Sequence, residues 1–359
     1  MPNRFAMAPM TRAASPDGIP GHDVAQYYRR RAAGGVGLII TESVRLPLPA
    51  ANNPTGIPTM AGEDVLAGWK QVVDGVHAEG GTIAAQLAHA GVARDDSDGI
   101  ESLSPSGLDL DGSPKGRALT THEMAEIAEA FAQSTLAARE VGFDAVELHG
   151  SHGYLLDQFL WERTNQRTDG YGGDLVSRTR FPAEVVAAIR AAVGPDYPIM
   201  FRFSQWKIAN YDVTIAEDPT QLGDLLAPLV DAGVDALHTS TRRHYLPGFP
   251  DIDPTLSLAG WTKKMTGIPV IAVGSVGLRT QFHVPVFEEG TTQFDTKKDN
   301  VIAPDSLDRL VEQFDAGEFD AVAVGRALLS DPTWVNRART GALHEFHGYD
   351  AQKALATLS

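Results

Sequence analysis

The sequence contains no cysteine, which excludes disulfide bonds, thiolate nucleophiles and iron–sulfur clusters held by the chain's own thiolates. Basic residues are also scarce: 30 Lys and Arg stand against 46 Asp and Glu, a formal net charge of -16. This balance argues against nucleic acid and anionic membrane surfaces as partners. The chain has no apolar run of about 18 residues, and Met1–Phe5 carries no apolar signal region. We therefore expect a cytoplasmic protein.

Short β-rich apolar runs alternate with amphipathic helical stretches along the 359 residues. Strands are expected at Arg4–Met10, Gly37–Glu42, Thr82–Leu87, Asp144–Leu148, Pro198–Phe203, Asp235–Thr239, Pro269–Val273 and Ala321–Val324. Helices are expected at Val24–Ala33, Glu63–Glu79, Thr121–Val141, Ser177–Ala192, Gln221–Ala232, Ser257–Met265, Ala303–Ala316 and Trp334–Thr340. No Pro/Gly/Ser linker divides the chain. This order predicts one domain, residues 1–359, folded as a (β/α)8 TIM barrel with elaborated loops at its C-terminal face.

Irregular stretches follow several predicted strands, and in a barrel they would lie over the C-terminal mouth, where active sites form. They span residues 88–119, 161–175, 241–253 and 278–301. The third begins with Thr241-Arg242-Arg243-His244-Tyr245, which is unusually basic for an acidic protein. Two interpretations stay open for this segment: a solvated loop, or a lid that contacts a cofactor phosphate or an anionic substrate.

Two histidines and a tyrosine follow the strand predicted at Asp144–Leu148. His149 and His152 are three residues apart, so on a helical turn they would lie side by side. Tyr154 would then be rotated well away from the pair. The arrangement suits a site in which two imidazole donors bind one substrate atom and a phenol addresses another. The alternative is a strand followed by a capped helix with incidental histidines.

Glycine-rich segments follow the seventh and eighth predicted strands. The first contains Gly274, Ser275 and Gly277, and the second contains Gly325 and Arg326. Glycine lets the backbone approach an anion closely, and an arginine adds a charge-assisted, fork-shaped contact. This pair of loops is the usual phosphate site of such barrels. A phosphorylated ligand is therefore predicted, although any strand-to-helix turn also favours glycine.

Two more polar residues end predicted strands. The amide of Gln86 offers a donor and an acceptor together, which suits a heterocycle such as a flavin pyrimidine. Arg202, if it points into the barrel, needs an anion or a delocalised negative charge as partner. A locally satisfied amide and a salt-bridged arginine are the alternatives.

Several motifs occur in the order typical of one enzyme family. They are Arg4–Arg12, Gly37–Glu42, Gln86–Gly91, His149–Leu160 with Asn165–Gly173, and Gly325-Arg326 with Asp331-Pro332. On these motifs, which cover nearly the whole chain, the sequence resembles the old yellow enzyme family of NADH:flavin oxidoreductases. The resemblance implies non-covalent FMN as cofactor and NAD(P)H as reductant. It also implies an ene-reductase that reduces the activated C=C bond of α,β-unsaturated carbonyl or nitro compounds by ping-pong hydride transfer.

The resemblance also assigns roles to individual residues. Around the flavin it places Pro9, Met10 and Ser43 along the isoalloxazine, Thr11 at O4, Gln86 at the pyrimidine edge, Arg202 at N1/O2, and Gly274, Ser275, Gly277, Gly325 and Arg326 on the phosphate. His149 and His152 would bind the carbonyl or nitro oxygen, and Tyr154 would donate the proton. Some family members carry Trp where Ala88 stands, so the pocket is expected to be roomier there.

A hypothesis from another class is a metal-dependent hydrolase barrel that uses His89, His149, His152 and His238. Against it, the first strand lacks the paired histidines common in such barrels, and no carboxylate at a strand end stands out as a bridging group. In the family that the sequence resembles, the first strand is normally preceded by a hairpin that plugs the barrel bottom, whereas this chain begins almost at the strand; either the start is truncated or the plug is reduced. NADH or NADPH, and a monomer or a homo-oligomer, stay open.

Overall fold

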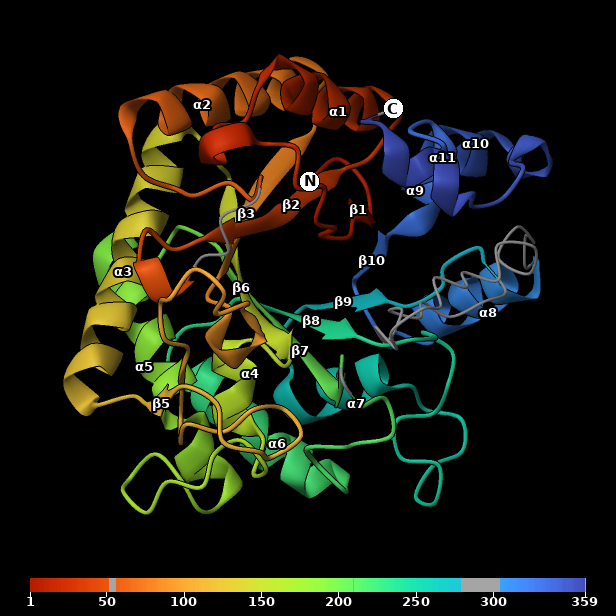
Figure 1. Cartoon of the computed structure of the whole chain (residues 1–359). Coiled ribbons are helices and arrows are strands. Elements are labelled where there is room, and N and C mark those ends of the chain that lie inside the picture. The colour runs from red at the N-terminus through yellow and green to blue at the C-terminus, as the bar shows by residue number, and fades with distance from the viewer. Residues whose placement is uncertain (52–55, 209, 279–303, 359) are drawn as a thin grey trace.

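The structure is a computed structural model that describes residues 1–51, 56–208, 210–278 and 304–358. Eight parallel strands close into a barrel surrounded by helices (Figure 1), which confirms the predicted TIM-barrel fold. The strands are β1 Phe5–Met7, β2 Leu38–Arg45, β3 Thr82–Ala88, β6 Ala145–His152, β7 Ile199–Lys207, β8 Ala236–Ser240, β9 Val270–Val273 and β10 Ala321–Val324. They follow one another around the barrel in chain order, and β10 pairs with β1 to close it.

Every predicted strand is present, but three of them run three or four residues further toward the mouth than predicted. β2 continues to Arg45, where it pairs with Ala88 of β3. β6 continues to His152 and β7 to Lys207, and these two residues pair with each other. Backbone pairing with a neighbouring strand therefore extends the barrel wall through segments whose glycines and polar residues are typical of loops.

Helices lie between successive strands and cover the outside of the barrel (Figure 1). Their bounds are α1 His22–Ala33, α2 Glu63–Ala78, α3 Thr121–Val141, α4 Leu155–Leu160, α5 Leu175–Val193, α6 Pro219–Asp231, α7 Leu258–Thr266, α8 Pro304–Asp315, α9 Arg326–Ser330, α10 Trp334–Thr340 and α11 Ala351–Ala356. Helix α3 begins with a capping box: the hydroxyl of Thr120 accepts from the backbone of Glu123, whose carboxylate accepts from the Thr120 backbone. Gly142 then ends this helix in the left-handed conformation.

The inside of the barrel has an apolar lower layer and a polar upper layer. The lower layer is filled by aliphatic side chains that include Ala6, Ile40, Ala84, Ala145, Met200, Ile271 and Ala323. Side chains alternate between the two faces of a strand, so the next inward position lies two residues further on. On the four neighbouring strands β3, β6, β7 and β8 this position carries a buried polar side chain: Gln86, Glu147, Arg202 and His238.

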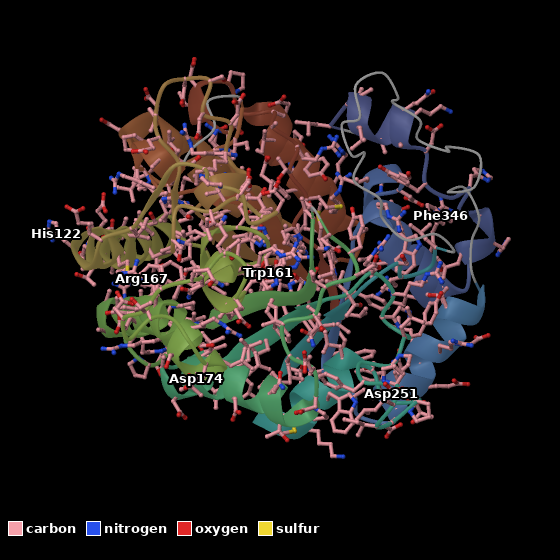
Figure 2. All side chains as sticks on the ribbon, turned by 60° about the horizontal axis from the view of Figure 1, so that its bottom comes forward. His122, Trp161, Arg167, Asp174, Asp251 and Phe346 are labelled. Carbon is pink, nitrogen blue, oxygen red and sulfur yellow. The ribbon has the colours of Figure 1, made fainter. Side chains whose placement is uncertain are left out.

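The loop that follows β3 is anchored to the segment that follows β6. It contains the short paired strands β4, Leu103–Ser104, and β5, Arg117–Ala118. Val92 and Leu110 from this loop form an apolar cluster with Trp161 at the end of α4. Figure 2 shows Trp161 near the middle of the molecule, with His122 toward its edge. The irregular stretch predicted at residues 278–301 lies outside the described residues, apart from its first member.

Within the described ranges, no helix combines the length and the apolar character that crossing a membrane requires.

Candidate active site

A chain of hydrogen bonds crosses the polar upper layer of the barrel. Gln86 Nε2 donates to Glu147 Oε1 at 2.8 Å, and Glu147 Oε2 lies 2.6 Å from His238 Nδ1. Burial lowers the pKa of His238, and the carboxylate of Glu147 opposes that shift. Glu147 thus fixes the orientation of both neighbours. It leaves His238 Nε2 buried and without a partner among the described residues.

His149, His152 and Tyr154 lie together, but not in the arrangement that their spacing predicted. Both histidines belong to β6 and not to a helical turn. Their ring centroids are 5.3 Å apart, and the Tyr154 ring lies only 4.4 Å from that of His149. The expectations of a helical turn and of a tyrosine turned away are therefore wrong. The three rings still form the single group that the proposed chemistry needs.

A break in strand pairing explains how the two imidazoles come together. In a regular strand, residues 149 and 152 would point to opposite faces. The register of β6 against β7 shifts between Gly150 and His152, and His152 has a φ of 65°. Such irregularities re-aim a side chain at the end of a strand. This one turns His152 toward the same space as His149.

Serine hydroxyls hold both imidazoles. Ser151 Oγ lies 3.1 Å from His149 Nδ1, and Ser240 Oγ lies 2.7 Å from His152 Nε2. Burial lowers the pKa of both histidines well below the usual value, and the positive charge of Arg202 adds to the shift. Both rings are therefore neutral near pH 7. When one nitrogen of a neutral imidazole is hydrogen-bonded to a serine, the other nitrogen is available to bind a ligand.

The ring of His152 packs against other aromatic side chains. It lies 4.4 Å from Trp206 at an interplanar angle of 23°, and Trp206 lies 5.4 Å from Tyr211. Arg242 completes the stack, with Cζ 3.9 Å from the Tyr211 ring centroid. The stack links the histidine to the basic loop that follows β8.

Tyr154 precedes the first residue of α4 and is half-buried. Arg45 lies over its ring, with Cζ 4.8 Å from the centroid, and Arg45 Nη2 donates to the hydroxyl at 3.5 Å. A fully buried ion pair joins helix α4 to β7: Lys207 Nζ lies 2.7 Å from Asp157 Oδ1. Asp157 Oδ2 also accepts from the backbone of Gly153 at 2.6 Å. These bonds fix the turn that presents the tyrosine.

The two glycine-rich loops after β9 and β10 contact each other. Arg326 Nη2 donates to Ser275 Oγ at 3.2 Å, and Ser275 Oγ donates to the carbonyl of Arg242 at 2.8 Å. Gly274 has a φ of 150°, and a Cβ added to it would lie 2.6 Å from Thr241 Oγ1. Only glycine fits there. The structure thus brings together Gly274, Ser275, Gly277, Gly325 and Arg326, as the sequence predicted.

The basic loop after β8 is packed against the first of these glycine-rich loops. The ring of His244 is buried and bonds to Gln313 and Ser306 of α8, and its backbone N–H donates to Gly274 O at 3.1 Å. The interpretation of this segment as a solvated loop is therefore wrong for His244. A contact from Arg242 or Arg243 to a phosphate stays a prediction.

Comparison with known proteins shows the family of the chain. The model of the NADH:flavin oxidoreductase / NADH oxidase family matches residues 1–294. The chain belongs to this family. NADH oxidase from Thermoanaerobacter brockii is 34% identical over 355 residues, which cover 96% of this chain and 49% of that protein. Putative 12-oxophytodienoate reductase 3 from Oryza sativa subsp. japonica is 30% identical, and the match covers 96% of this chain and 84% of that protein.

Solved structures give the same result. Morphinone reductase in complex with tetrahydroNAD superposes with a TM-score of 0.77 and 30% identity, over 99% of this chain and 93% of that one. The predicted family is confirmed, and with it FMN as the cofactor and a nicotinamide as the reductant. The chain spans about half the length of the first two curated relatives it matches, 49% of one and 47% of the other.

The residues at the mouth fit the FMN of this NADH:flavin oxidoreductase family. Ser43 lies opposite Gln86 in the pairing of β2 with β3, and its Oγ is buried without a partner among the described residues. Arg202 Nη2 donates to Ser240 Oγ at 3.1 Å, whereas Arg202 Nε has no described partner. Burial lowers the pKa of Arg202 to about 10, against the opposing charge of Glu147, so it remains cationic at pH 7. A flavin edge would supply the acceptors that these donors lack.

The segment after β1 reaches the same space. Pro9, Met10 and Thr11 follow the strand directly, and Thr11 is exposed. Met10 Sδ would lie 3.5 Å from a Cβ added to Gly325, so this segment is adjacent to the loop after β10. One predicted neighbour of the isoalloxazine, Met10, is therefore adjacent to one predicted neighbour of the phosphate, Gly325. Their individual roles stay predictions.

The metal-dependent hydrolase hypothesis has no support in this geometry. Among the residues that the structure describes, no three His, Asp or Glu side chains are grouped to hold a metal ion. His238 is bonded to Glu147, and His89 Nδ1 accepts from the backbone of Gly91 at 3.0 Å.

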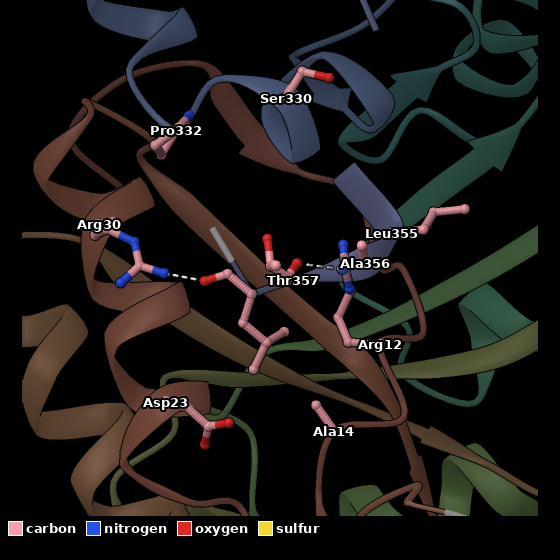
Figure 3. A pocket seen from close by; sticks show the side chains of 10 residues that line it. Arg12, Ala14, Asp23, Arg30, Ser330, Pro332, Leu355, Ala356 and Thr357 are labelled. Carbon is pink, nitrogen blue, oxygen red and sulfur yellow. Dashed lines mark hydrogen bonds between the residues drawn. The ribbon is translucent and has the colours of Figure 1, made fainter. Parts of the chain in front are cut away.

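An open cavity of ≈ 830 Å³ lies away from this mouth, between the segment after β1 and the C-terminal residues (Figure 3). Arg12 Nη2 donates to the carbonyls of Ala354 at 2.8 Å and Thr357 at 2.9 Å, and Arg30 donates to that of Leu358. None of the predicted site residues lines this cavity. Its arginines hold the C-terminal segment on the barrel and are not part of the candidate active site.

Glu147, Arg45 and Ser240 are among the residues of the site that were not predicted. A lone carboxylate inside the apolar run Ala145–Leu148 was a usable signal for the first. Ser240 directly follows the strand predicted at Asp235–Thr239, so its position was also a usable signal. Arg45 lies three residues beyond the predicted end of its strand, at Glu42, and had no such signal.

Proposed function

We propose that this protein is an FMN-dependent ene-reductase that uses NAD(P)H to reduce the activated C=C bond of α,β-unsaturated carbonyl or nitro compounds in a ping-pong cycle. The observation that supports this best is the group formed by two neutral imidazoles and one phenol at the barrel mouth. FMN, when bound, supplies the hydride chemistry. The protein supplies binding, orientation and the proton.

His149 and His152 would bind the oxygen of the activating carbonyl or nitro group. Negative charge develops on that oxygen as the double bond is reduced, and preorganised N–H donors stabilise such charge. Burial keeps both rings neutral, so each can donate one hydrogen bond while a serine holds its other nitrogen. The rings do not have to reorient during the reaction, because the serines and the aromatic stack fix them.

Tyr154 would donate the proton to the α-carbon. Its neighbour Arg45 carries only hydrogen-bond donors, so the phenol oxygen can accept from Arg45 but cannot give its proton to it. The hydroxyl proton is therefore directed elsewhere, toward the space shared with His149. A general acid placed in this way typically accelerates a reaction by about 10²–10⁴-fold.

Arg202 would stabilise negative charge at the flavin N1/O2 edge, and Thr11 would hydrogen-bond O4. The loops that carry Ser275 and Arg326 would hold the phosphate. These assignments rest on the unpartnered buried donors of the mouth and on the contact between the two glycine-rich loops.

The deciding experiment is an absorbance spectrum of the purified protein, followed by anaerobic titration with NADH, NADPH and a panel of enones. We expect a flavin spectrum with about one FMN per chain, bleaching by a nicotinamide and recovery of the oxidised spectrum with an enone. A colourless protein that cannot be reconstituted with FMN would refute the proposal. A flavoprotein that no enone reoxidises would refute the ene-reductase activity alone.

A further inference from the structure

We infer that Arg45 and His89 form an anion-binding subsite beside Tyr154, and that the alkene substrate carries a carboxylate that binds there. This inference rests on the proposed function and deepens it by naming a class of substrate. It concerns the C-terminal ends of β2 and β3, next to the candidate proton donor.

Arg45 is a buried cation whose bonding capacity is mostly unused. The residue is only 3% exposed, yet Nε and Nη1 have no partner among the described residues. Nη2 makes one long contact, 3.5 Å, with the hydroxyl of Tyr154. Arg45 pairs in register with Ala88, so the two side chains share a face of the barrel wall. Because Ala88 presents only a methyl group, the guanidinium has room beside it.

The buried carboxylates of the described region are bonded to other groups. Glu147 is bonded to Gln86 and His238, and Asp157 is paired with Lys207. Glu42 accepts from the backbone of the segment after β1. No described acidic residue forms an ion pair with Arg45. An unpaired buried charge is costly, which favours a bound anion as its counter-charge.

His89 supplies a second unused donor near Arg45, whose charge acts on it. It follows Ala88, the register partner of Arg45, and is 1% exposed. Its Nδ1 accepts from the backbone of Gly91, so the neutral ring carries its proton on Nε2, which is buried without a described partner. Burial, and then the charge of Arg45, lowers the pKa of His89 to about 3. The ring therefore remains a neutral donor.

Donors without acceptors match one ligand chemistry. A carboxylate has two acceptor oxygens in a plane, which the planar fork of a guanidinium binds with two parallel hydrogen bonds. With the activating carbonyl on His149 and His152, a carboxylate elsewhere on the substrate would bind Arg45. The expected substrates are enones with an acid group at the other end of the alkene, such as 4-oxo-2-enoates.

The test compares an acid with its ester. The reduced, flavin-loaded protein is reoxidised by 4-oxopent-2-enoate and by its methyl ester, and kcat/KM is measured for each. We expect the wild type to favour the acid. Arg45→Met, which keeps length but removes charge, should lower the acid-to-ester ratio by roughly 10- to 100-fold, the range for losing a charge-assisted bond. Arg45→Lys should restore part of the ratio.

A binding measurement supports the kinetic one and does not depend on turnover. Dissociation constants of 4-hydroxybenzoate and 4-hydroxybenzamide are measured on the oxidised holoenzyme. The wild type should prefer the anion, and the preference should fall in Arg45→Met and, to a smaller degree, in His89→Leu. Arg31→Met is the matched control, because Arg31 is equally buried but lies outside the mouth.

Three outcomes would overturn the inference. One is a wild type that reduces enones without favouring the acid or binding the benzoate more tightly than the amide; this outcome leaves the proposed function intact. Another is an equal fall of the ratio in Arg31→Met. The third is that Arg45→Met impairs only reduction by NADH or NADPH, which would mean that Arg45 binds an anionic group of the reductant and not of the alkene substrate. If Arg45→Met does not fold, the wild-type ratio and Arg45→Lys still decide.

Discussion

Two sets of buried arginines in this molecule have the same burial but opposite surroundings. Arg31 in α1 is fully buried; its Nε and Nη2 donate to the Leu328 carbonyl at 3.1 and 2.9 Å, and Nη1 donates to that of Tyr27 at 2.8 Å. Arg45 and Arg202 at the mouth are 3% and 7% exposed, yet each has guanidinium nitrogens without a described partner. The two sets therefore differ in the hydrogen bonding of their side chains and not in their burial.

The difference suggests how to separate structural from functional polar residues in such a barrel. A buried cation with all its donors satisfied by carbonyls joins two elements, here α1 and α9. A buried cation whose N–H donors lack acceptors in the described chain is expected to bind a ligand. Substitutions in the first set should therefore reduce stability, and substitutions in the second should reduce binding or catalysis.

The largest effect is expected for a mouth residue whose loss leaves packing intact. Tyr154→Phe keeps the ring beside His149 and Arg45 but removes the proton, so reoxidation of the reduced protein by an enone should slow by about 10²–10⁴-fold. Stopped-flow absorbance measures this rate. Reduction by the nicotinamide and binding of a phenol should survive. Loss of phenol binding, or an unchanged enone rate, would contradict the assigned role.

The next largest effect is expected at the contact between the two glycine-rich loops. Arg326→Ala removes a charged donor, and FMN should be retained roughly 10- to 100-fold more weakly, as judged by equilibrium dialysis. Arg339→Ala, at an exposed position on α10, is the matched control. Equal retention of FMN by the two variants would show that Arg326 does not contact the phosphate.

A smaller effect, on stability alone, is expected from substitution of Arg31. Arg31→Met removes the guanidinium that donates to the carbonyl of Leu328, and this should cost about 1–3 kcal/mol in the free energy of unfolding. Urea denaturation of the flavin-free protein measures the cost. Arg45→Met should cost nothing in the same assay, because it removes an unpaired buried charge. A larger loss in Arg45→Met than in Arg31→Met would reverse the comparison.

The smallest effect is expected from pH. The pKa values of His149 and His152 are lowered well below 6.5, so both rings become protonated only in more acidic solution. Between about pH 6 and 8 both remain neutral donors, and the affinity for a neutral amide such as 4-hydroxybenzamide should show no inflection near 6.5. A pH titration of the dissociation constant tests this. A loss of affinity centred near 6.5 would mean that at least one ring titrates as it would in water.

The sequence was sufficient for the architecture because each strand is a short apolar run between helical patterns, and hydrophobic periodicity is a local property. It was less informative about strand ends. Gly150, Ser151 and Gly153 are typical of a loop, and only pairing with β7 keeps β6 extended through His152. A local sequence pattern does not predict tertiary pairing of this kind.

The two histidines and the tyrosine of the site were predicted, but their geometry and the residues that hold them were not. Family motifs named His149, His152 and Tyr154, and the structure brings their rings together. The bonds that hold them, from Ser240 on β8 and from Arg45 on β2, join strands that are far apart in sequence. One chain without aligned relatives does not reveal such pairs.

The positive φ of His152 has a consequence for engineering. A left-handed backbone is costly for a residue with a Cβ, by about 1–3 kcal/mol when the surroundings impose it, and glycine adopts it freely. A library screened only for heat resistance should therefore enrich His152→Gly, whereas a library screened for turnover should discard it. Position 152 is where those two selections are expected to disagree most, and it should be held constant when the barrel is stabilised for use as a biocatalyst.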